Sequence, residues 1–140
     1  MILFLVGVVG LIGIQFVPYG RDHTNPPVIS EPTWDSPATR AFAVIGCFDC
    51  HSNQSKWPWY SNVAPISWLV QRDVDEGRQH LNFSTWGTGE NEGAHAAEML
   101  SSGEMPPFQY LLAHPEARFS DADKAAFIKG LIATLGGAAD

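Results

Sequence analysis

Basic residues and cysteines are both scarce in this sequence, and each scarcity argues against a class of function. Eight Lys and Arg stand against 15 Asp and Glu, so the formal net charge is −7. Binding to nucleic acid requires a basic surface that neutralises phosphates, so we expect no nucleic-acid partner. A basic protein surface is a more natural docking target. The chain has only two cysteines. A zinc site built on them would need one or two further ligands close by, and no other cysteine can supply them.

The N-terminal stretch is uncharged and apolar. Residues 1–17 hold no charged side chain and are interrupted only by Gln15, and Arg21 is the first charged residue. As a helix, this stretch would be about 26 Å long, close to the ~30 Å hydrocarbon core of a bilayer. There is no basic segment in front of it and no small-x-small cleavage pattern before Pro18, which disfavours a signal peptide. We therefore expect residues 1–18 to be a transmembrane anchor, with a signal sequence as the alternative.

The rest of the chain predicts an all-α domain behind a tether. Residues 19–35 are rich in proline and have no helical period, which indicates an extended tether, and residues 36–140 form the domain. A first helix begins at the Ser36 cap and Pro37 and runs through ATRAFAVIG into residues 47–51. A second covers residues 65–81, with one face formed by Ile66, Leu69, Val70 and Val74. A fragment near residues 90–101 adds another. The last helix begins at the Ser120 cap, stops near Gly136 and carries an apolar stripe, formed by Phe127, Ile128, Leu131, Ile132 and Leu135. No alternation typical of strands is present.

The motif at residues 46–53, GCFDCHSN, carries the chemistry. Cys47, Cys50 and His51 would project to one side of a helical turn, as covalent haem attachment requires: two thiols for the vinyl groups and one imidazole for the iron. A redox dithiol would favour a βαβ context with the cysteines at a helix start. The C-x-x-C-H pattern and the helical context favour a c-type haem, bound once and covalently.

The block CFDCHSNQSKWPWYSNVAPISWLVQRDVDEGRQHLNFSTW, followed by GEMPP, resembles the bacterial haem-binding domain family of short, membrane-anchored c-type proteins, over roughly residues 21–118. The resemblance implies that Cys47, Cys50 and His51 hold haem. The wider outline is similar to a class I cytochrome c: helix, haem motif, helices, a Met-Pro loop and a terminal helix. One feature differs from that pattern, since residues 52–65 are more aromatic than is usual after the motif. The function of the family is itself poorly defined, so the resemblance supports haem binding better than it supports a physiological role.

Met105 is the predicted sixth ligand of the iron. It stands in SGEMPPF, where Pro106 and Pro107 enforce an extended loop that can carry the side chain to the distal face. Met and His are the usual axial pair of cytochromes c. His114, just before Pro115, is the main competitor, and Met99, His95, His80 and His23 are the remaining candidates.

Three further side chains are candidate donors to haem propionates, because buried carboxylates need hydrogen-bond donors. They are Trp59, Tyr60 and Arg72. Asp73, Asp75, Glu90 and Glu92 are interpreted as solvated acids, and no catalytic triad, phosphate-binding loop or paired carboxylate site stands out.

These observations predict an electron carrier or electron-transfer subunit rather than an enzyme. We expect a monohaem c-type cytochrome held in the bacterial cytoplasmic membrane by a single span, with its haem domain on the periplasmic or exterior side. It would pass electrons to redox proteins, or within a larger membrane complex. Two alternatives stay open: an accessory or structural haem subunit of such a complex, and a haem sensor or peroxidase-like protein with an open distal site.

Overall fold

The computed structural model describes residues 1–88 and 92–137, and every regular element in these residues is a helix. The only bridge of β type between described residues is an isolated parallel pair, Ser30 with Thr85. The all-α prediction is therefore confirmed for this part of the chain. The α-helices are α1 (Ile2–Ile14), α2 (Pro37–Gly46), α3 (Phe48–His51), α4 (Ile66–His80), α5 (Ala96–Ser102), α6 (Phe108–Ala113) and α7 (Asp121–Leu135). Short 3₁₀ turns are η1 (Trp59–Asn62), η2 (Gly93–His95) and η3 (Pro115–Ala117).

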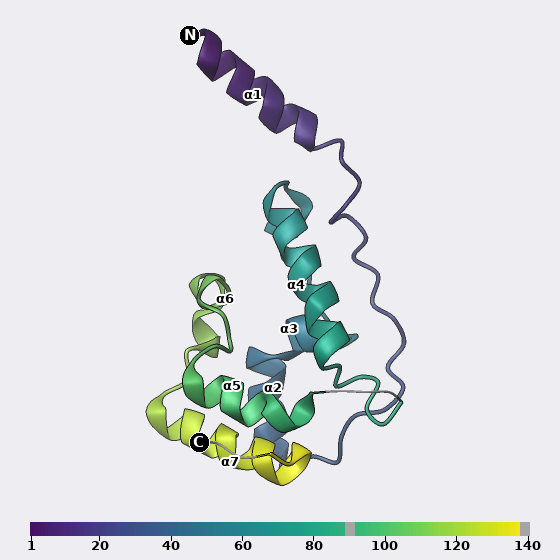
Figure 1. The fold of residues 1–140 in the computed structure, drawn as a ribbon, viewed down its shortest axis with the longest axis vertical. Helices are drawn as coiled ribbons and strands as arrows, with labels where there is room; N and C mark the ends of the chain where they lie inside the picture. The colour runs from purple at the N-terminus through teal and green to yellow at the C-terminus, as the bar shows by residue number, and fades with distance from the viewer. Residues whose placement is uncertain (89–91, 138–140) are drawn as a thin grey trace.

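Helix α1 projects away from the domain (Figure 1). Among the described helices, none combines the length and the apolar character needed to cross a bilayer. Residues 19–35 form no helix, as expected of a tether, but they are attached along the domain. The amide of Ile29 donates to the carbonyl of Ser84 at 2.8 Å, and Asn53 Nδ2 donates to the carbonyl of Pro27 at 2.8 Å. The tether thus lies on the domain surface.

The predicted start of α2 and both predicted ends of α7 are confirmed. Ser36 Oγ accepts the amide of Thr39 at 3.2 Å, with Pro37 in the first turn. Ser120 Oγ accepts the amide of Asp123 at 3.1 Å. Helix α7 stops before Gly136, whose φ of +80° suits glycine. Of the predicted 90–101 fragment, residues 93–102 are helical as η2 and α5, while Glu90 lies outside the described residues.

The apolar face predicted for α4 is not its packing face. Val74 is buried, but the other buried residues of the helix are small, Ser67 and Gly77, while Ile66 and Leu69 are exposed. At Gly77 no side chain fits because the backbone of α4 approaches α3 closely there. A Cβ there would lie 2.7 Å from the carbonyl oxygen of Cys50.

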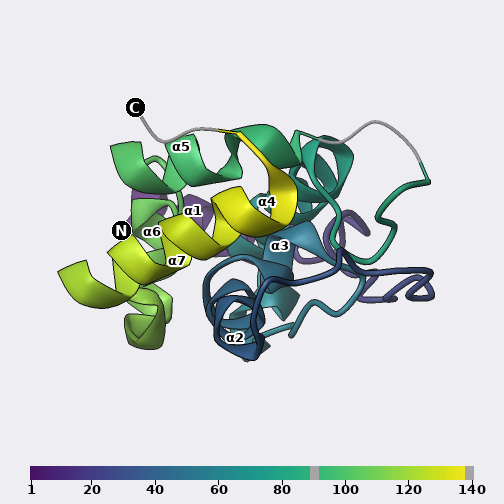
Figure 2. The ribbon, with the colours of Figure 1, turned by 90° about the horizontal axis from the view of Figure 1, so that it is seen from below.

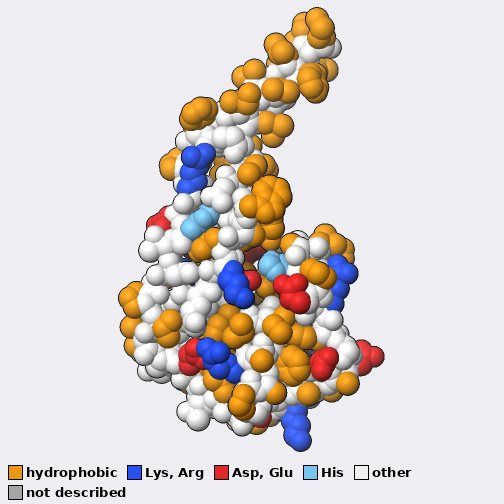
Figure 3. All heavy atoms as spheres, turned by 180° about the vertical axis from the view of Figure 1, so that it is seen from behind, with side chains coloured by type: hydrophobic (Ala, Val, Ile, Leu, Met, Phe, Trp, Pro, Cys, Tyr) orange, Lys and Arg blue, Asp and Glu red, His pale blue; other side chains and the backbone are white. Residues whose placement is uncertain are grey.

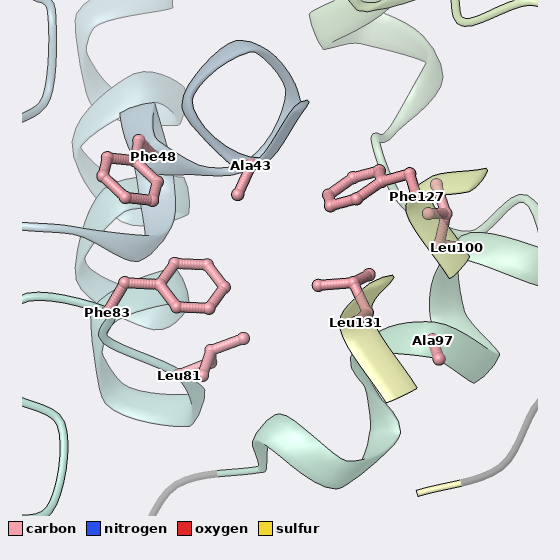
Figure 4. Close-up of a cluster of buried hydrophobic side chains, with 8 residues drawn as sticks. All are labelled: Ala43, Phe48, Leu81, Phe83, Ala97, Leu100, Phe127 and Leu131. Atoms are coloured by element: carbon pink, nitrogen blue, oxygen red, sulfur yellow. The ribbon is translucent and has the colours of Figure 1, made fainter. Parts of the chain in front are cut away.

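The hydrophobic core joins two layers of helices. Helix α5 packs along α7, α2 contacts both α7 and α3, and α4 packs against α3 (Figures 1 and 2). The buried cluster divides into two facing groups in Figure 4. Phe48, Phe83 and Leu81 lie on one side, and the second group, from α5 and α7, lies on the other, comprising Ala97, Leu100, Phe127 and Leu131. Ala43 of α2 lies between them.

Candidate functional site

The cysteine motif forms its own short helix. Helix α2 ends at Gly46, and Cys47 leaves the helical conformation with φ −130° and ψ −38°. Helix α3 then begins, and the amide of His51 donates to the carbonyl of Cys47 at 2.8 Å. The prediction that the motif ends the first helix was therefore wrong, because the chain turns at Cys47. The turn still places Cys47, Cys50 and His51 in the lining of one cavity.

His51 is held through one ring nitrogen. Its Nδ1 lies 2.9 Å from the carbonyl oxygen of Gly77 and 3.1 Å from that of Leu81. Both partners are acceptors, so Nδ1 carries the proton and Nε2 keeps its lone pair. Burial lowers the pKa of His51 and favours the neutral ring. A neutral imidazole whose Nδ1–H donates to backbone carbonyls is the usual arrangement of a histidine that binds a metal.

The two cysteines are free thiols with little tendency to ionise. Burial is the main cause that raises the pKa of Cys47 and of Cys50 to about 12, and neighbouring negative charge adds to it. A redox-active dithiol or a thiolate nucleophile needs the opposite shift. Within residues 1–88 and 92–137, no group of three or more His, Cys, Asp or Glu side chains is placed to bind a metal ion. A buried thiol is compatible with covalent attachment of an apolar group beside it.

The cavity beside the motif has a volume of about 460 Å³. Such a volume is typical of a pocket for a small molecule or cofactor. Cys47, Cys50 and His51 contribute to it from the α3 side, and Met99 and Met105 from α5 and the loop after it. Residues of the hydrophobic core form its apolar wall, namely Leu81, Phe83, Leu100, Phe127 and Leu131. Two thiols, an imidazole and thioethers in an apolar cavity form a donor set that fits haem.

Carboxylates surround the polar part of the cavity. Asp73, Glu76 and Glu92 line it together with His80 and His95, and no Lys or Arg of the described residues does. The predicted propionate donors lie elsewhere. Arg72 is exposed and pairs with Asp73 at 3.2 Å and with Glu76 at 3.8 Å.

The other two predicted donors are also outside the cavity lining. Trp59 is 79% exposed, and the hydroxyl of Tyr60 lies 3.2 Å from His114 Nε2. The structure thus brings neither Trp59, Tyr60 nor Arg72 to the cavity that the motif lines.

The candidates for a sixth ligand separate into two groups. Met105, Met99, His80 and His95 line the cavity. His114 does not: its ring stacks on Tyr110 with centroids 4.0 Å apart. His23 stacks on Trp57 with centroids 4.4 Å apart and is likewise outside the lining. Met105 as the ligand stays a prediction, and its side chain is 40% exposed.

Three residues of the site were missed by sequence reasoning. Gly77 and Leu81 supply the carbonyls for His51, and backbone acceptors leave no mark in side-chain patterns. The lone glycine within the charged helix 66–80 was the available signal, since such a glycine often marks a close approach. Tyr110 lines the cavity and its hydroxyl lies 2.9 Å from Asp49 Oδ2, inside the motif. Burial raises the pKa of Tyr110, which therefore stays a donor.

One comparison with known proteins points to the same ligand, haem. A family model described as a haem-binding domain matches residues 9–133, which is most of the chain. No curated protein and no solved structure matches it.

Proposed function

Because the chain belongs to the haem-binding domain family, we propose that it is a membrane-anchored monohaem c-type cytochrome that transfers electrons. One observation carries the proposal. The two thiols of the motif, the imidazole of His51 and the thioether of Met105 contribute to a single, largely apolar cavity, and His51 Nδ1 is already engaged by backbone carbonyls.

The residues of the motif would have distinct roles. The thiols of Cys47 and Cys50 would hold haem through thioethers, formed by addition of S–H across its two vinyl groups, which needs no oxidant. His51 Nε2 and the thioether of Met105 would hold the iron. Haem held in this way supplies a one-electron ferric/ferrous couple. A thioether ligand and the aromatic core favour the ferrous state and a comparatively high potential.

The anchor and the location are part of the same proposal. We place residues 1–18 in the cytoplasmic membrane and the haem domain on the periplasmic or exterior side, where c-type attachment takes place in this family. With a net charge of −7 and carboxylates around the cavity, a redox partner with a basic surface is favoured. Such a partner can be a separate protein or a neighbouring subunit of a membrane complex.

Covalent attachment is tested on the purified protein under denaturing conditions. We expect haem to remain with the polypeptide through acid extraction and denaturing electrophoresis, and to be lost in the double variant Cys47→Ala with Cys50→Ala. Recovery of two free thiols from the haem-loaded protein would contradict attachment.

The electron-carrier function is tested at the sixth ligand by absorption spectra with and without carbon monoxide. The wild type should be low-spin in both oxidation states and slow to bind carbon monoxide, whereas Met105→Ala should bind it readily. Met99→Leu is the matched control, because Met99 lines the same cavity and Leu has a similar volume. If Met105→Ala leaves both spectra unchanged, the ligand assignment is wrong.

A haem protein with an open distal site is the second candidate, and the 40% exposure of Met105 is the observation that favours it. Rapid carbon monoxide binding by the wild type would select this function over electron transfer.

A further inference from the structure

Two uncharged stretches of the chain meet in the folded protein. Residues 1–20 contain no Lys, Arg, Asp or Glu, and neither do residues 57–71, WPWYSNVAPISWLVQ. Basic residues bound both stretches, namely Arg21 after the first, and Lys56 and Arg72 on either side of the second. Three of the eight Lys and Arg of the chain thus stand at these boundaries.

Hydrogen bonds and close packing attach one stretch to the other. Gln15 Nε2 donates to the carbonyl of Ala64 at 2.9 Å, and the amide of Ala64 donates back to Gln15 Oε1 at 3.0 Å. At Gly20, where φ is +78°, a Cβ would lie 2.6 Å from the carbonyl oxygen of Ser67. The end of α1 is therefore docked against the turn that precedes α4 and against the first turn of α4.

The apolar side chains beside this junction face outward. Trp59 is 79% exposed, Val63 42%, Ile66 46% and Leu69 53%. We name these four residues the junction surface. In Figure 3, hydrophobic atoms cover the α1 stalk and continue onto the part of the domain at its base, while most acidic and basic side chains lie farther from the stalk. An exposed apolar surface of this kind marks an interaction site.

We propose that the junction surface lies in the headgroup layer of the bilayer that holds α1. The inference rests on the proposed anchor, since it is α1 that would bring the surface to the lipid. Three properties favour lipid over a protein partner: the surface continues that of the apolar helix, it carries a Trp, and its charged borders include Arg21 and Lys56. Trp is enriched at the membrane interface, and basic side chains beside it bind anionic headgroups.

Contact with the bilayer would set the orientation of the domain. Along α4, Gly77 lies 11 positions beyond Ile66, which corresponds to about 16 Å of helix. The His51 side of the cavity would then be held roughly one domain radius from the lipid, and α7 would face away from it (Figure 1). A redox partner would approach from the aqueous side rather than through the membrane.

The test places a nitroxide spin label at single introduced cysteines of the full-length, haem-loaded protein in liposomes with anionic lipid. Accessibility to oxygen and to a water-soluble nickel complex is then measured. Val9→Cys reports on α1, Ile66→Cys on the junction surface, and Ala126→Cys is the matched control, on the exposed face of α7. Wild-type protein treated in the same way shows whether Cys47 and Cys50 take up label, and Val63→Cys replaces Ile66→Cys if the latter loses its haem spectrum.

We expect the ratio of oxygen to nickel accessibility to be high at Val9, intermediate at Ile66 and low, as in water, at Ala126. A water-like ratio at Ile66 with a high ratio at Val9 would overturn the inference and leave the anchor intact. Shielding of Ile66 from both reagents would mean that protein covers the surface, and would also overturn it. A water-like ratio at Val9 would remove the anchor itself.

Discussion

Replacing Gly77 by Ala tests whether the close approach of α4 to the cysteine motif matters for the haem. The added methyl carbon would lie 2.7 Å from the carbonyl oxygen of Cys50 and 3.0 Å from Cys50 Cβ. An ordinary contact begins at 3.4 Å, so α4 must retreat by about 0.7 Å. The carbonyl of Gly77 moves with the helix, and its 2.9 Å separation from His51 Nδ1 grows toward the limit of a hydrogen bond.

The energetic terms of this substitution oppose one another. Ala in place of Gly within a helix stabilises by about 1 kcal/mol. Overpacking costs roughly 1–3 kcal/mol, and the weakened hydrogen bond about 1 kcal/mol more. We therefore expect a net loss of about 1–3 kcal/mol in the free energy of unfolding, measured by urea denaturation. A weaker hydrogen bond at Nδ1 would also make His51 a poorer electron donor to ferric iron, so the midpoint potential should rise. Each tenfold loss of affinity for ferric relative to ferrous iron corresponds to a rise of about 59 mV.

Gly130→Ala is the matched control for the steric effect. Its methyl carbon would clash with the side chain of Thr39, with Oγ1 nearest and Cγ2 at 2.8 Å, at the contact between α7 and α2. This variant should lose stability while keeping the wild-type potential and spectrum. The reasoning is refuted if Gly77→Ala stabilises the protein, or if both variants lose stability equally and neither changes the potential.

Two further predictions concern polar contacts of the domain. Glu31 accepts hydrogen bonds from Nε and Nη2 of Arg40, both at 2.7 Å, and these bonds lower the pKa of Glu31 to about 2. The stability that this pair contributes is fully present above pH 4.5 and is lost as the pH falls toward 2. Glu31→Gln should therefore cost roughly 1–2 kcal/mol at pH 7 and much less at pH 2, measured by urea unfolding at both pH values. An equal loss at both pH values would contradict this prediction. Tyr110→Phe removes the hydroxyl that lies 2.9 Å from the Asp49 carboxylate and should cost about 1.5–3 kcal/mol. The control Tyr60→Phe, whose hydroxyl lies 3.2 Å from His114 Nε2 rather than beside a carboxylate, should cost about 1 kcal/mol or less. Equal losses in the two thermal or urea unfolding curves would show that the charge of the acceptor is unimportant.

Helix ends were predictable because their signals are local. The Ser36 and Ser120 caps bind amides three residues away, and Gly136 ends α7 through its own φ angle. The two cysteines and His51 are equally local, so the motif indicated haem before any fold was known, and the family match agrees with that indication.

Packing between distant segments determined the rest of the site. His51 finds its acceptors 26 and 30 residues further along the chain, at carbonyls whose position depends on how closely α4 meets α3. His114 and Met105 were both plausible ligands in sequence, yet only Met105 lines the cavity, because His114 stacks on Tyr110 instead.

The helical period of α4 was read correctly from the sequence, but its buried face was not. Apolar spacing placed Ile66 and Leu69 with Val74, whereas the folded chain buries Val74 with Ser67 and Gly77. Apolar spacing predicts which side chains would gain from burial. Which of them the protein itself covers depends on how closely the backbones approach one another, and at residue 77 the contact of α4 with Cys50 leaves room only for glycine.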